Sequence, residues 1–385
     1  MAREPSFIPF NRPGITGAEQ AYLAEVMQRG KFAGGGPFSK RCNTWLQEHF
    51  GVAGALVTTS CTHALEMAAL LCELTPGDEV IAPSFGFSST ATAFVRCGAR
   101  MVFVDVEPRT MNIDPRAVAA AVTDKTRVIV ALHYAGVACD MDALNEIAQR
   151  HDLMIVEDAA QAIFADYKGR PCGTLGDFGC FSFHETKNVQ CGEGGALLVQ
   201  KAHHAERAEI IWEKGTDRAR FFRGEVDKYT WRDIGSSYVL SELNAAFLLA
   251  QLEHGQAITD DRLASWNAYR EGLAPLAAVG SLEIPDIPEE CRHNGHIFWI
   301  KPRDLDERTA LIEFLGTHSI HSVFHYVPLH STPAGERFGI FAGEDRTTTR
   351  DAERLLRLPL FLRFSETERV IDAVRAFYAQ AAGID

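Results

Sequence analysis

The sequence lacks the features that mark membrane-spanning, secreted and nucleic-acid-binding proteins. No stretch of about 18 apolar residues occurs, and residues 1–10 contain no long apolar segment, so neither a membrane span nor a signal peptide is expected. No Lys/Arg-rich run occurs either, and the net charge is −13. Non-specific binding of nucleic acid requires a basic face. We therefore expect a protein with no membrane partner and no nucleic-acid partner.

The sequence also lacks the cysteine spacings of a disulfide-stabilised or zinc-binding protein. It contains nine cysteines, an odd number, and no C-x-x-C pair. A disulfide framework or a zinc module would show regular, paired spacings. We therefore expect a cytoplasmic protein without a metal site.

What is present is an ordinary globular composition in a long chain. The 385 residues are 46% hydrophobic and 23% charged, as in globular proteins with a sizeable core. The chain is too long for one small core, and its length suits a large α/β domain followed by a smaller one.

Short apolar runs alternate with segments of helical periodicity between residues 53 and 200. The expected strands centre on residues 56–57, 80–81, 101–106, 128–132, 153–156 and 197–199. The expected helices cover residues 62–74, 88–97, 115–122 and 141–150. This alternation predicts an α/β fold with a largely parallel sheet flanked by helices on both faces.

The pattern changes after residue 201. Long helices are expected near residues 238–253 and 257–273, and a second α/β segment begins near residue 296. We therefore expect a large domain over residues 1–255 and a small C-terminal domain over residues 256–385.

A first candidate site lies at residues 59–64, Thr-Ser-Cys-Thr-His-Ala, where an expected strand ends and a helix begins. The free N–H groups of a helix start attract anions, and small hydroxyl side chains let a phosphate approach closely. The alternative interpretation is simple helix capping by Ser60 or Thr59.

A second candidate is Asp158, which directly follows an apolar strand in Val-Glu-Asp-Ala-Ala-Gln. An acid at the carboxyl end of a parallel strand points into the ligand crevice. A carboxylate there can pair with a protonated pyridine nitrogen and keep the ring electron-poor. A helix cap and a metal ligand remain alternatives for this residue.

A third candidate is Lys187, within residues 182–188, Ser-Phe-His-Glu-Thr-Lys-Asn. A partly desolvated lysine near a strand end can form an imine with an aldehyde cofactor. Ser182 could reach the phosphate of the same cofactor. The alternative for a single lysine is a solvated surface residue.

Taken together, these motifs resemble the pyridoxal-phosphate-dependent sugar-nucleotide aminotransferases of the DegT/StrS type. The resemblance covers nearly the whole chain. It is strongest to the branch that makes dTDP-4-amino-4,6-dideoxygalactose for enterobacterial common antigen and related lipopolysaccharide O-antigens. The segments that carry it are residues 127–139, 179–188 (GCFSFHETKN), 226–237 (VDKYTWRDIGSS), 324–330 (FHYVPLH) and 355–360 (LLRLPL).

This resemblance implies a type I aminotransferase fold, a homodimer with shared active sites, and pyridoxal 5′-phosphate as cofactor. Lys187 matches the lysine that carries the cofactor, and Asp158 matches the partner of its pyridine nitrogen. Ser237 stands where an asparagine from the neighbouring subunit usually binds the phosphate. The other implied cofactor contacts are Cys61, Thr62 and Ser182 at the phosphate, Phe87 on the ring face and Gln161 beside the ring.

The resemblance further implies L-glutamate as amino donor and a dTDP-linked 4-keto-6-deoxy sugar as acceptor. The product would be dTDP-4-amino-4,6-dideoxy-D-galactose, made with ping-pong kinetics. Candidate substrate contacts are His184, Lys214, Tyr229, Tyr326 and His330. For each of them a packed core position or a solvated loop position is the alternative.

Three other functions fit parts of this pattern. The acceptor could be a different keto sugar nucleotide, either a 3-keto sugar or a UDP-linked one. A non-catalytic sensor could bind the same cofactor, although the presence of both Lys187 and Asp158 argues against it. A nicotinamide dehydrogenase is disfavoured because the first strand is followed by Thr-Ser-Cys-Thr-His-Ala and not by G-x-G-x-x-G.

Overall fold

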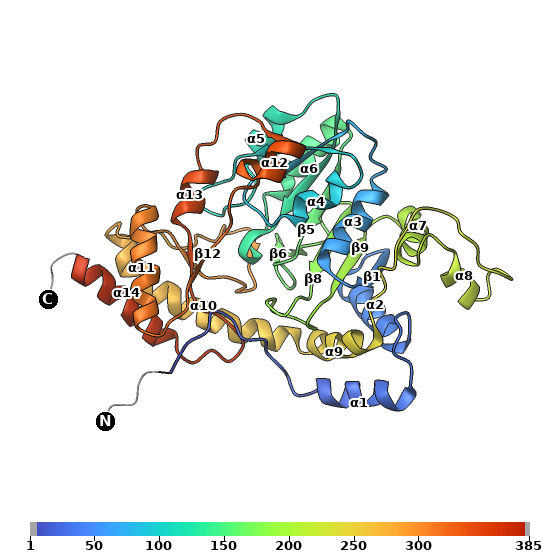
Figure 1. Ribbon diagram of the computed structural model, residues 1–385, viewed down its shortest axis with the longest axis horizontal. Helices are drawn as coiled ribbons and strands as arrows, with labels where there is room; N and C mark the ends of the chain where they lie inside the picture. Colours follow the sequence, from blue (N-terminus) through green and yellow to red (C-terminus); the bar gives the residue numbers. More distant parts are fainter. Residues whose placement is uncertain (1–5, 382–385) are drawn as a thin grey trace.

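The centre of the molecule is an eight-stranded sheet with helices on both faces (Figure 1). The computed structural model describes residues 6–381. The strand order is β1-β9-β8-β5-β4-β2-β3-β13. The bounds are β1 Gly54–Thr58, β2 Glu79–Pro83, β3 Arg100–Val104, β4 Thr126–Leu132, β5 Met154–Asp158, β8 Phe178–Ser182, β9 Gly195–Val199 and β13 Gly339–Phe341. Because β13, β3, β2, β4, β5 and β8 pair in parallel, the predicted α/β fold is confirmed.

Strand β9 runs antiparallel to both of its neighbours, β8 and β1. The chain passes from β8 to β9 through the loop 183–194 and has no helix there. Parallel neighbours are usually joined by a crossover helix, so a connection without a helix is typical of an antiparallel pair. The loop therefore lies at the carboxyl end of β8, beside the ends of β5 and β4.

The middle residues of the central strands are apolar because both faces of the sheet are buried there. In β4, Val128 and Val130 belong to one hydrophobic core, while Ile129 and Ala131 belong to the core on the opposite face. The first core includes helices α3 Cys61–Leu71, α4 Ser89–Val95 and α7 Ala202–Trp212. The second includes α2 Pro37–Phe50, α5 Pro115–Ala121, α6 Met141–His151 and α9 Glu242–Glu253.

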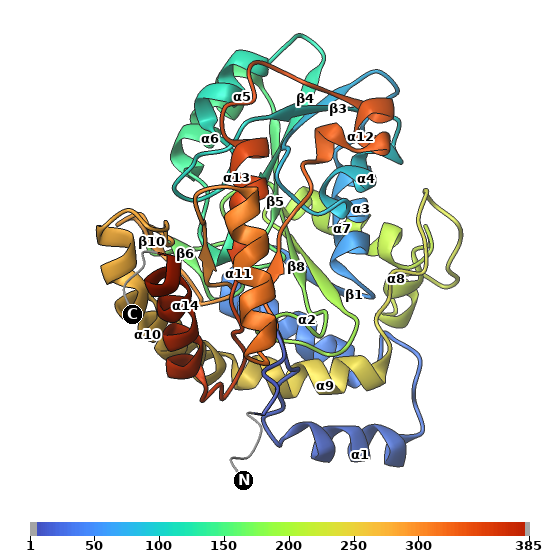
Figure 2. The ribbon, with the colours of Figure 1, turned by 60° about the vertical axis from the view of Figure 1, so that its left-hand side comes forward.

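A third hydrophobic core holds the C-terminal part of the chain together. In it, α14 (Thr367–Ala381) packs against both the long helix α10 (Gly255–Ala278) and α11 (Leu305–Thr317), as Figure 2 shows. A small antiparallel sheet, in the order β11-β14-β12, accompanies these helices. Its strands are β11 Trp299–Ile300, β12 Val323–Phe324 and β14 Leu356–Arg357.

Two connections cross the expected domain boundary at residue 255. Ile8, near the start of the chain, pairs with Ile320 and is buried in the third core. Strand β13, which follows the C-terminal helix α12 (Pro333–Phe338), joins the edge of the large sheet beside β3. The division into domains 1–255 and 256–385 stays a prediction.

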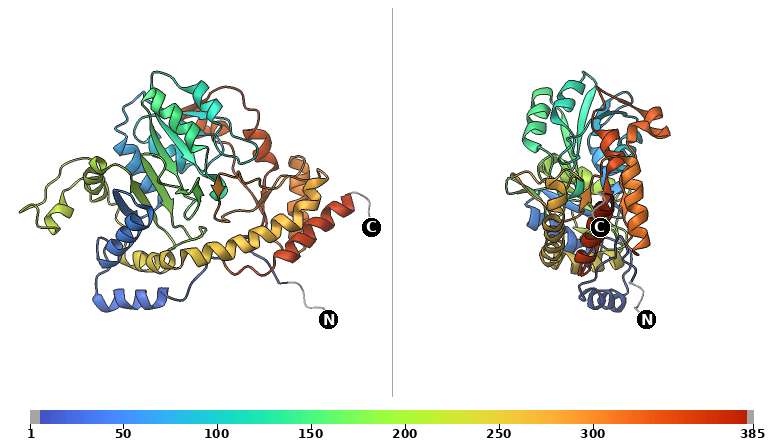
Figure 3. Two further views of the ribbon diagram at one scale, coloured as in Figure 1. Left: turned by 180° about the vertical axis from the view of Figure 1, so that it is seen from behind. Right: turned by 90° about the vertical axis from the view of Figure 1, so that its left-hand side faces the viewer.

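Residues 213–237, which we call the projecting segment, include α8 (Arg218–Phe222). The part around α8 extends away from the large sheet, as seen from behind in Figure 3. Over residues 6–381, no helix combines the length and apolar character that crossing a membrane requires. The remaining elements are α1 Glu19–Arg29, β6 Asp166–Tyr167, β7 Arg170–Pro171, β10 Cys291–Arg292, α13 Thr348–Arg354 and the 3₁₀ turns η1 Tyr134–Gly136 and η2 Leu329–Ser331.

Candidate active site

A cavity of about 660 Å³ opens at the carboxyl ends of the parallel strands. The last residues of β4, β5 and β8, namely Leu132, Asp158 and Ser182, line it on one side. Arg262 of α10 and Arg357 of β14 line it on the other side. Ligands of α/β proteins bind at this edge of the sheet, so this cavity is the candidate active site.

Asp158 is buried in the cavity wall. Its Oδ2 accepts a 2.7 Å hydrogen bond from Oγ1 of Thr90, and its Oδ1 accepts a 3.3 Å bond from the N–H of Ala160. Burial raises the pKa of Asp158 above its ordinary value, while the two hydrogen bonds and the charge of Lys187 act in the opposite direction. The site therefore holds a desolvated carboxylate whose charged form a cationic partner would stabilise.

Lys187 lines the same cavity from the loop 183–194. The loop is closed by hydrogen bonds of 2.8 Å from the N–H of Phe183 to the carbonyl of Gly194 and of 2.8 Å from the N–H of Glu185 to the carbonyl of Gly192. Burial lowers the pKa of Lys187, although the nearby Asp158 opposes that shift. A larger neutral fraction of the amine makes it a better nucleophile and base.

The N-terminus of α3 also faces the cavity. Ser60 caps the helix, since its Oγ accepts a 3.2 Å hydrogen bond from the N–H of His63. Cys61 and Thr62 lie in the first turn of this helix and line the cavity. Backbone N–H groups in the first turn of a helix have no partner within that helix. Oγ1 of Thr62 lies 2.7 Å from Oγ of Ser89, a further cavity residue that the sequence motifs did not single out.

Gln161 and Tyr326 connect the two sides of the cavity. Nε2 of Gln161 donates a 3.1 Å hydrogen bond to the phenol oxygen of Tyr326, and Oε1 of Gln161 accepts a 2.7 Å bond from the N–H of Ala135. The ring of Phe87 lies with its centroid 6.3 Å from that of Tyr326 and is 60% exposed. His184 lies at the mouth, with Nδ1 2.9 Å from the hydroxyl of Thr186.

Four predicted contacts lie outside this cavity. Lys214, Tyr229 and Ser237 all belong to the projecting segment, where each is exposed or forms its contacts within that segment. His330 has its Nδ1 2.6 Å from the hydroxyl of the buried Ser84 and its Nε2 3.4 Å from a carboxylate oxygen of Asp345. In this chain His330 therefore ties the segment after β12 to the end of β2.

Two arginines of the cavity wall were not recognised from sequence. The buried Arg262 donates hydrogen bonds to the backbone carbonyls of Gly295, His296 and Leu360, and burial lowers its pKa to about 9. Arg357 donates from Nη2 to the carbonyl of Phe324 at 3.0 Å. A single charged residue inside the apolar run Leu-Leu-Arg-Leu-Pro-Leu was the available signal for Arg357.

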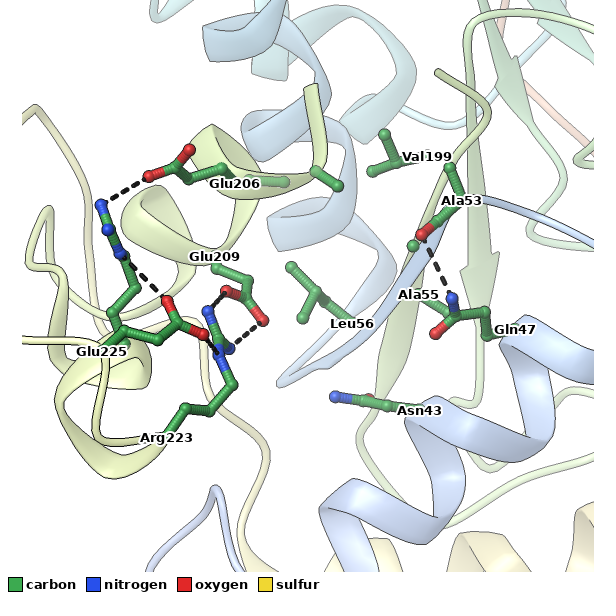
Figure 4. A pocket seen from close by; sticks show the side chains of 14 residues that line it. Asn43, Gln47, Ala53, Ala55, Leu56, Val199, Glu206, Glu209, Arg223 and Glu225 are labelled. Atoms are coloured by element: carbon green, nitrogen blue, oxygen red, sulfur yellow. Dashed lines mark hydrogen bonds and ion pairs between the residues drawn. The ribbon is translucent and has the colours of Figure 1, made fainter. Parts of the chain in front are cut away.

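A second cavity, of about 430 Å³, lies at the β1 edge of the sheet near α2 and α7 (Figure 4). Its arginines are neutralised by neighbouring acids. Arg223 points to Glu209 and Glu225, with N–O distances of 2.9 and 2.6 Å, and Arg220 pairs with Glu206 and Glu225. Both arginines of this cavity are therefore already paired with carboxylates. Across the described residues 6–381, no cluster of His, Cys, Asp and Glu side chains is suited to a metal.

Known proteins share this fold. Residues 13–375 match the DegT/DnrJ/EryC1/StrS aminotransferase family. The spore coat polysaccharide biosynthesis protein SpsC of Bacillus subtilis is 31% identical over 387 residues, covering 96% of each chain. The aminotransferase TlmJ from Streptoalloteichus hindustanus superposes with a TM-score of 0.89 at 31% identity, over 97% of this chain and 100% of that one. DesV of S. venezuelae, solved in complex with a ketimine intermediate, superposes with a TM-score of 0.87 at 30% identity, over 97% and 99%.

Proposed function

Because the chain belongs to the DegT/DnrJ/EryC1/StrS aminotransferase family, we propose that it transfers an amino group from L-glutamate to C4 of a dTDP-linked 4-keto-6-deoxy sugar. The product is dTDP-4-amino-4,6-dideoxy-D-galactose. Members of this family are sugar aminotransferases that depend on pyridoxal 5′-phosphate. We propose this particular sugar because the segments around Lys187, Ser237 and Tyr326 most resemble the branch of the family that makes this product.

The observation that carries the proposal is that Lys187, Asp158 and the start of α3 line one cavity. Pyridoxal phosphate presents an aldehyde, a pyridine nitrogen and a phosphate. The three protein groups are an amine, a carboxylate and a helix N-terminus with the Thr62 hydroxyl, so the donor set fits the cofactor. Phe87 and Gln161 also line this cavity, and we propose that Phe87 covers a face of the cofactor ring and that Gln161 lies beside it.

When bound, the cofactor supplies an electron-poor ring that stabilises negative charge on the carbon that loses a proton. Lys187 would hold the cofactor through its amine, and the same amine would move a proton on and off the reacting carbon. Its lowered pKa increases the neutral fraction that can accept this proton. Asp158 keeps a proton on the pyridine nitrogen, and the hydrogen bond from Thr90 favours the charged form that this requires.

Borohydride reduction of the purified protein tests the role of Lys187. Reduction fixes the cofactor to its lysine, and we expect the label on the peptide that contains residue 187. A Lys187→Arg variant is expected to take up no label, whereas Lys201→Arg, at the exposed start of α7, is expected to be labelled normally. A label on any other peptide of the wild-type protein would contradict the assignment.

An acceptor screen tests the proposed sugar. Enzyme preloaded with the amino group by L-glutamate should pass it to dTDP-4-keto-6-deoxyglucose faster than to UDP-linked or 3-keto sugar nucleotides. A preference for one of those sugars would replace the proposed substrate. Failure to react with any amino donor, despite labelling at Lys187, would instead indicate a cofactor-binding sensor.

We also propose a cytoplasmic homodimer with shared sites. The projecting segment carries Ser237 and exposes large apolar side chains, among them Trp231, which is 82% exposed. Such surface favours burial against a second copy, which would bring Ser237 to the partner's phosphate site. The nine cysteines are free thiols, which fits a reducing compartment. Light scattering should give twice the chain mass of 42.5 kDa, and an active monomer would contradict the shared site.

A further inference from the structure

The side of the cavity wall formed by the C-terminal region carries an excess of positive charge. The wall contains the cations Lys187, Arg262 and Arg357 and the carboxylates Asp158 and Glu193. In the proposed function, Lys187 and Asp158 are committed to the cofactor. Arg262 is satisfied by three backbone carbonyls. Glu193 pairs with His184 at the mouth, 3.6 Å away. Arg357 is the cation that remains.

Arg357 has no anionic partner within the part of the chain that the structure describes. Its Nη2 donates to one carbonyl, that of Phe324, and its guanidinium lies 4.6 Å from the ring centroid of Phe10. Its Nε is buried and has no hydrogen-bond partner among the described residues. By contrast Arg354, three residues earlier at the end of α13, pairs with Glu283 and Asp351. A buried donor without an acceptor is unfavourable unless a ligand supplies one.

The polar groups around Arg357 do not provide this acceptor. Burial, assisted by the nearby arginine, lowers the pKa of His296 and of His325 well below the ordinary value, so both imidazoles are neutral. Each already has a partner at Nδ1. That of His296 lies 2.8 Å from Oδ1 of Asn188, and that of His325 lies 3.0 Å from the phenol oxygen of Tyr134.

We propose that Arg357 binds the α-carboxylate of the amino-acid donor. The planar guanidinium matches a carboxylate through two parallel hydrogen bonds, and among the described residues only Nη2 of Arg357 has a partner. This inference rests on the proposed function, because it takes an amino acid to be one of the two substrates.

The position of Arg357 favours the donor over the sugar nucleotide. Its charge is close enough to Lys187 to contribute to the lowered pKa of that amine. The α-carboxylate is attached to the carbon that reacts at Lys187. The pyrophosphate of the acceptor, by contrast, is separated from the reacting C4 by the width of the sugar ring. An anion site near the reacting amine therefore fits the amino acid.

Arg357→Gln is the test, and Arg308→Gln is its matched control. Arg308 is also half-buried, also has an unpartnered Nε and also packs on an aromatic ring, that of Phe324, but it does not line the cavity. Calorimetry would measure binding of 2-oxoglutarate and of dTDP to each holoenzyme. Stopped-flow absorbance would measure the half-reaction with L-glutamate and with L-alanine.

In Arg357→Gln we expect affinity for 2-oxoglutarate, and kcat/KM in the half-reaction with both amino acids, to fall about 10- to 100-fold. Affinity for dTDP should stay unchanged, and Arg308→Gln should behave as wild type. Arg357→Lys keeps the charge without the planar fork and should recover part of the loss. It also provides the measurement if the glutamine variant does not fold.

Wild-type affinity for 2-oxoglutarate in Arg357→Gln would overturn the inference, and so would an equal loss of dTDP affinity or a loss confined to L-glutamate. The proposed function fails separately. If the wild type binds 2-oxoglutarate through Arg357 but aminates no sugar nucleotide, the inference stands and the proposed acceptor is wrong. If the wild type binds no 2-oxo acid, the inference is overturned directly.

Discussion

Replacing Thr90 by valine isolates the effect of one hydrogen bond on Asp158. Thr90 is fully buried in α4, and its hydroxyl donates the shorter of the two hydrogen bonds to the carboxylate, 2.7 Å against 3.3 Å from Ala160. Valine keeps the shape of the side chain and removes the donor. Hydrogen bonds to charged groups contribute about 1.5–3 kcal/mol. Because one pKa unit corresponds to about 1.4 kcal/mol, the pKa of Asp158 should rise by about 1–2 units.

The direction of this pKa shift determines how the pH dependence of cofactor binding should change. Burial already raises the pKa of Asp158, and the hydrogen bond from Thr90 opposes that effect. Without it, the carboxylate is protonated at higher pH and loses its attraction for the pyridine nitrogen. We expect the affinity of the apoprotein for pyridoxal phosphate to decline as pH falls, with its midpoint about 1–2 units higher in Thr90→Val than in wild type. Thr92→Val, at an exposed position of the same helix, is the control.

The same variant makes a second prediction for stability. A carboxyl whose folded pKa is above its unfolded value binds protons more tightly when folded, so the free energy of unfolding falls as pH rises between the two values. Thr90→Val widens that interval. The variant should match wild type in acid and lose about 1.5–3 kcal/mol above the interval. Identical midpoints for cofactor binding in the two proteins would refute the role given to Thr90.

Three further perturbations test other groups of the structure. Glu157→Gln should lower the free energy of unfolding in urea by about 3–5 kcal/mol, because this fully buried carboxylate bonds to His133 at 2.8 Å; a loss below about 1 kcal/mol would show that the pair is dispensable. Lys301→Met should also cost about 3 kcal/mol in thermal or urea unfolding, because Lys301 is buried and its Nζ lies 2.6 Å from Asp351. Since burial lowers the pKa of Lys187, trinitrobenzenesulfonate should modify this amine in the apoprotein at a pH where exposed lysines react slowly. Peptide mapping that finds no preference would contradict this shift.

The groups that the sequence predicted are those whose positions follow from local pattern. Asp158 directly follows an apolar strand, and Lys187 follows the next one in the sheet, so parallel strand ends bring both to one edge. Thr90 was missed because nothing local distinguishes it, and Arg357 was missed because a single charge inside an apolar run does not show what that charge faces. A threonine in a short helix acquires its role when folding brings Thr90 within 2.7 Å of Asp158 at the end of β5, and Arg357 does so when β14 lies beside the cavity. Strand β13 was missed because three residues give no readable period.

The two sides of the cavity come from different parts of the fold. In the proposed function, one side holds the cofactor and the other side selects the substrates. The large sheet presents the lysine and the acid, whereas β14 and the segment after β12 present Arg357 and Tyr326. If the proposed roles hold, we expect substitutions in those short C-terminal pieces to change which amine or sugar is accepted while the proposed cofactor-binding groups stay in place. A single scaffold can thus give rise to enzymes of many specificities through changes confined to one wall.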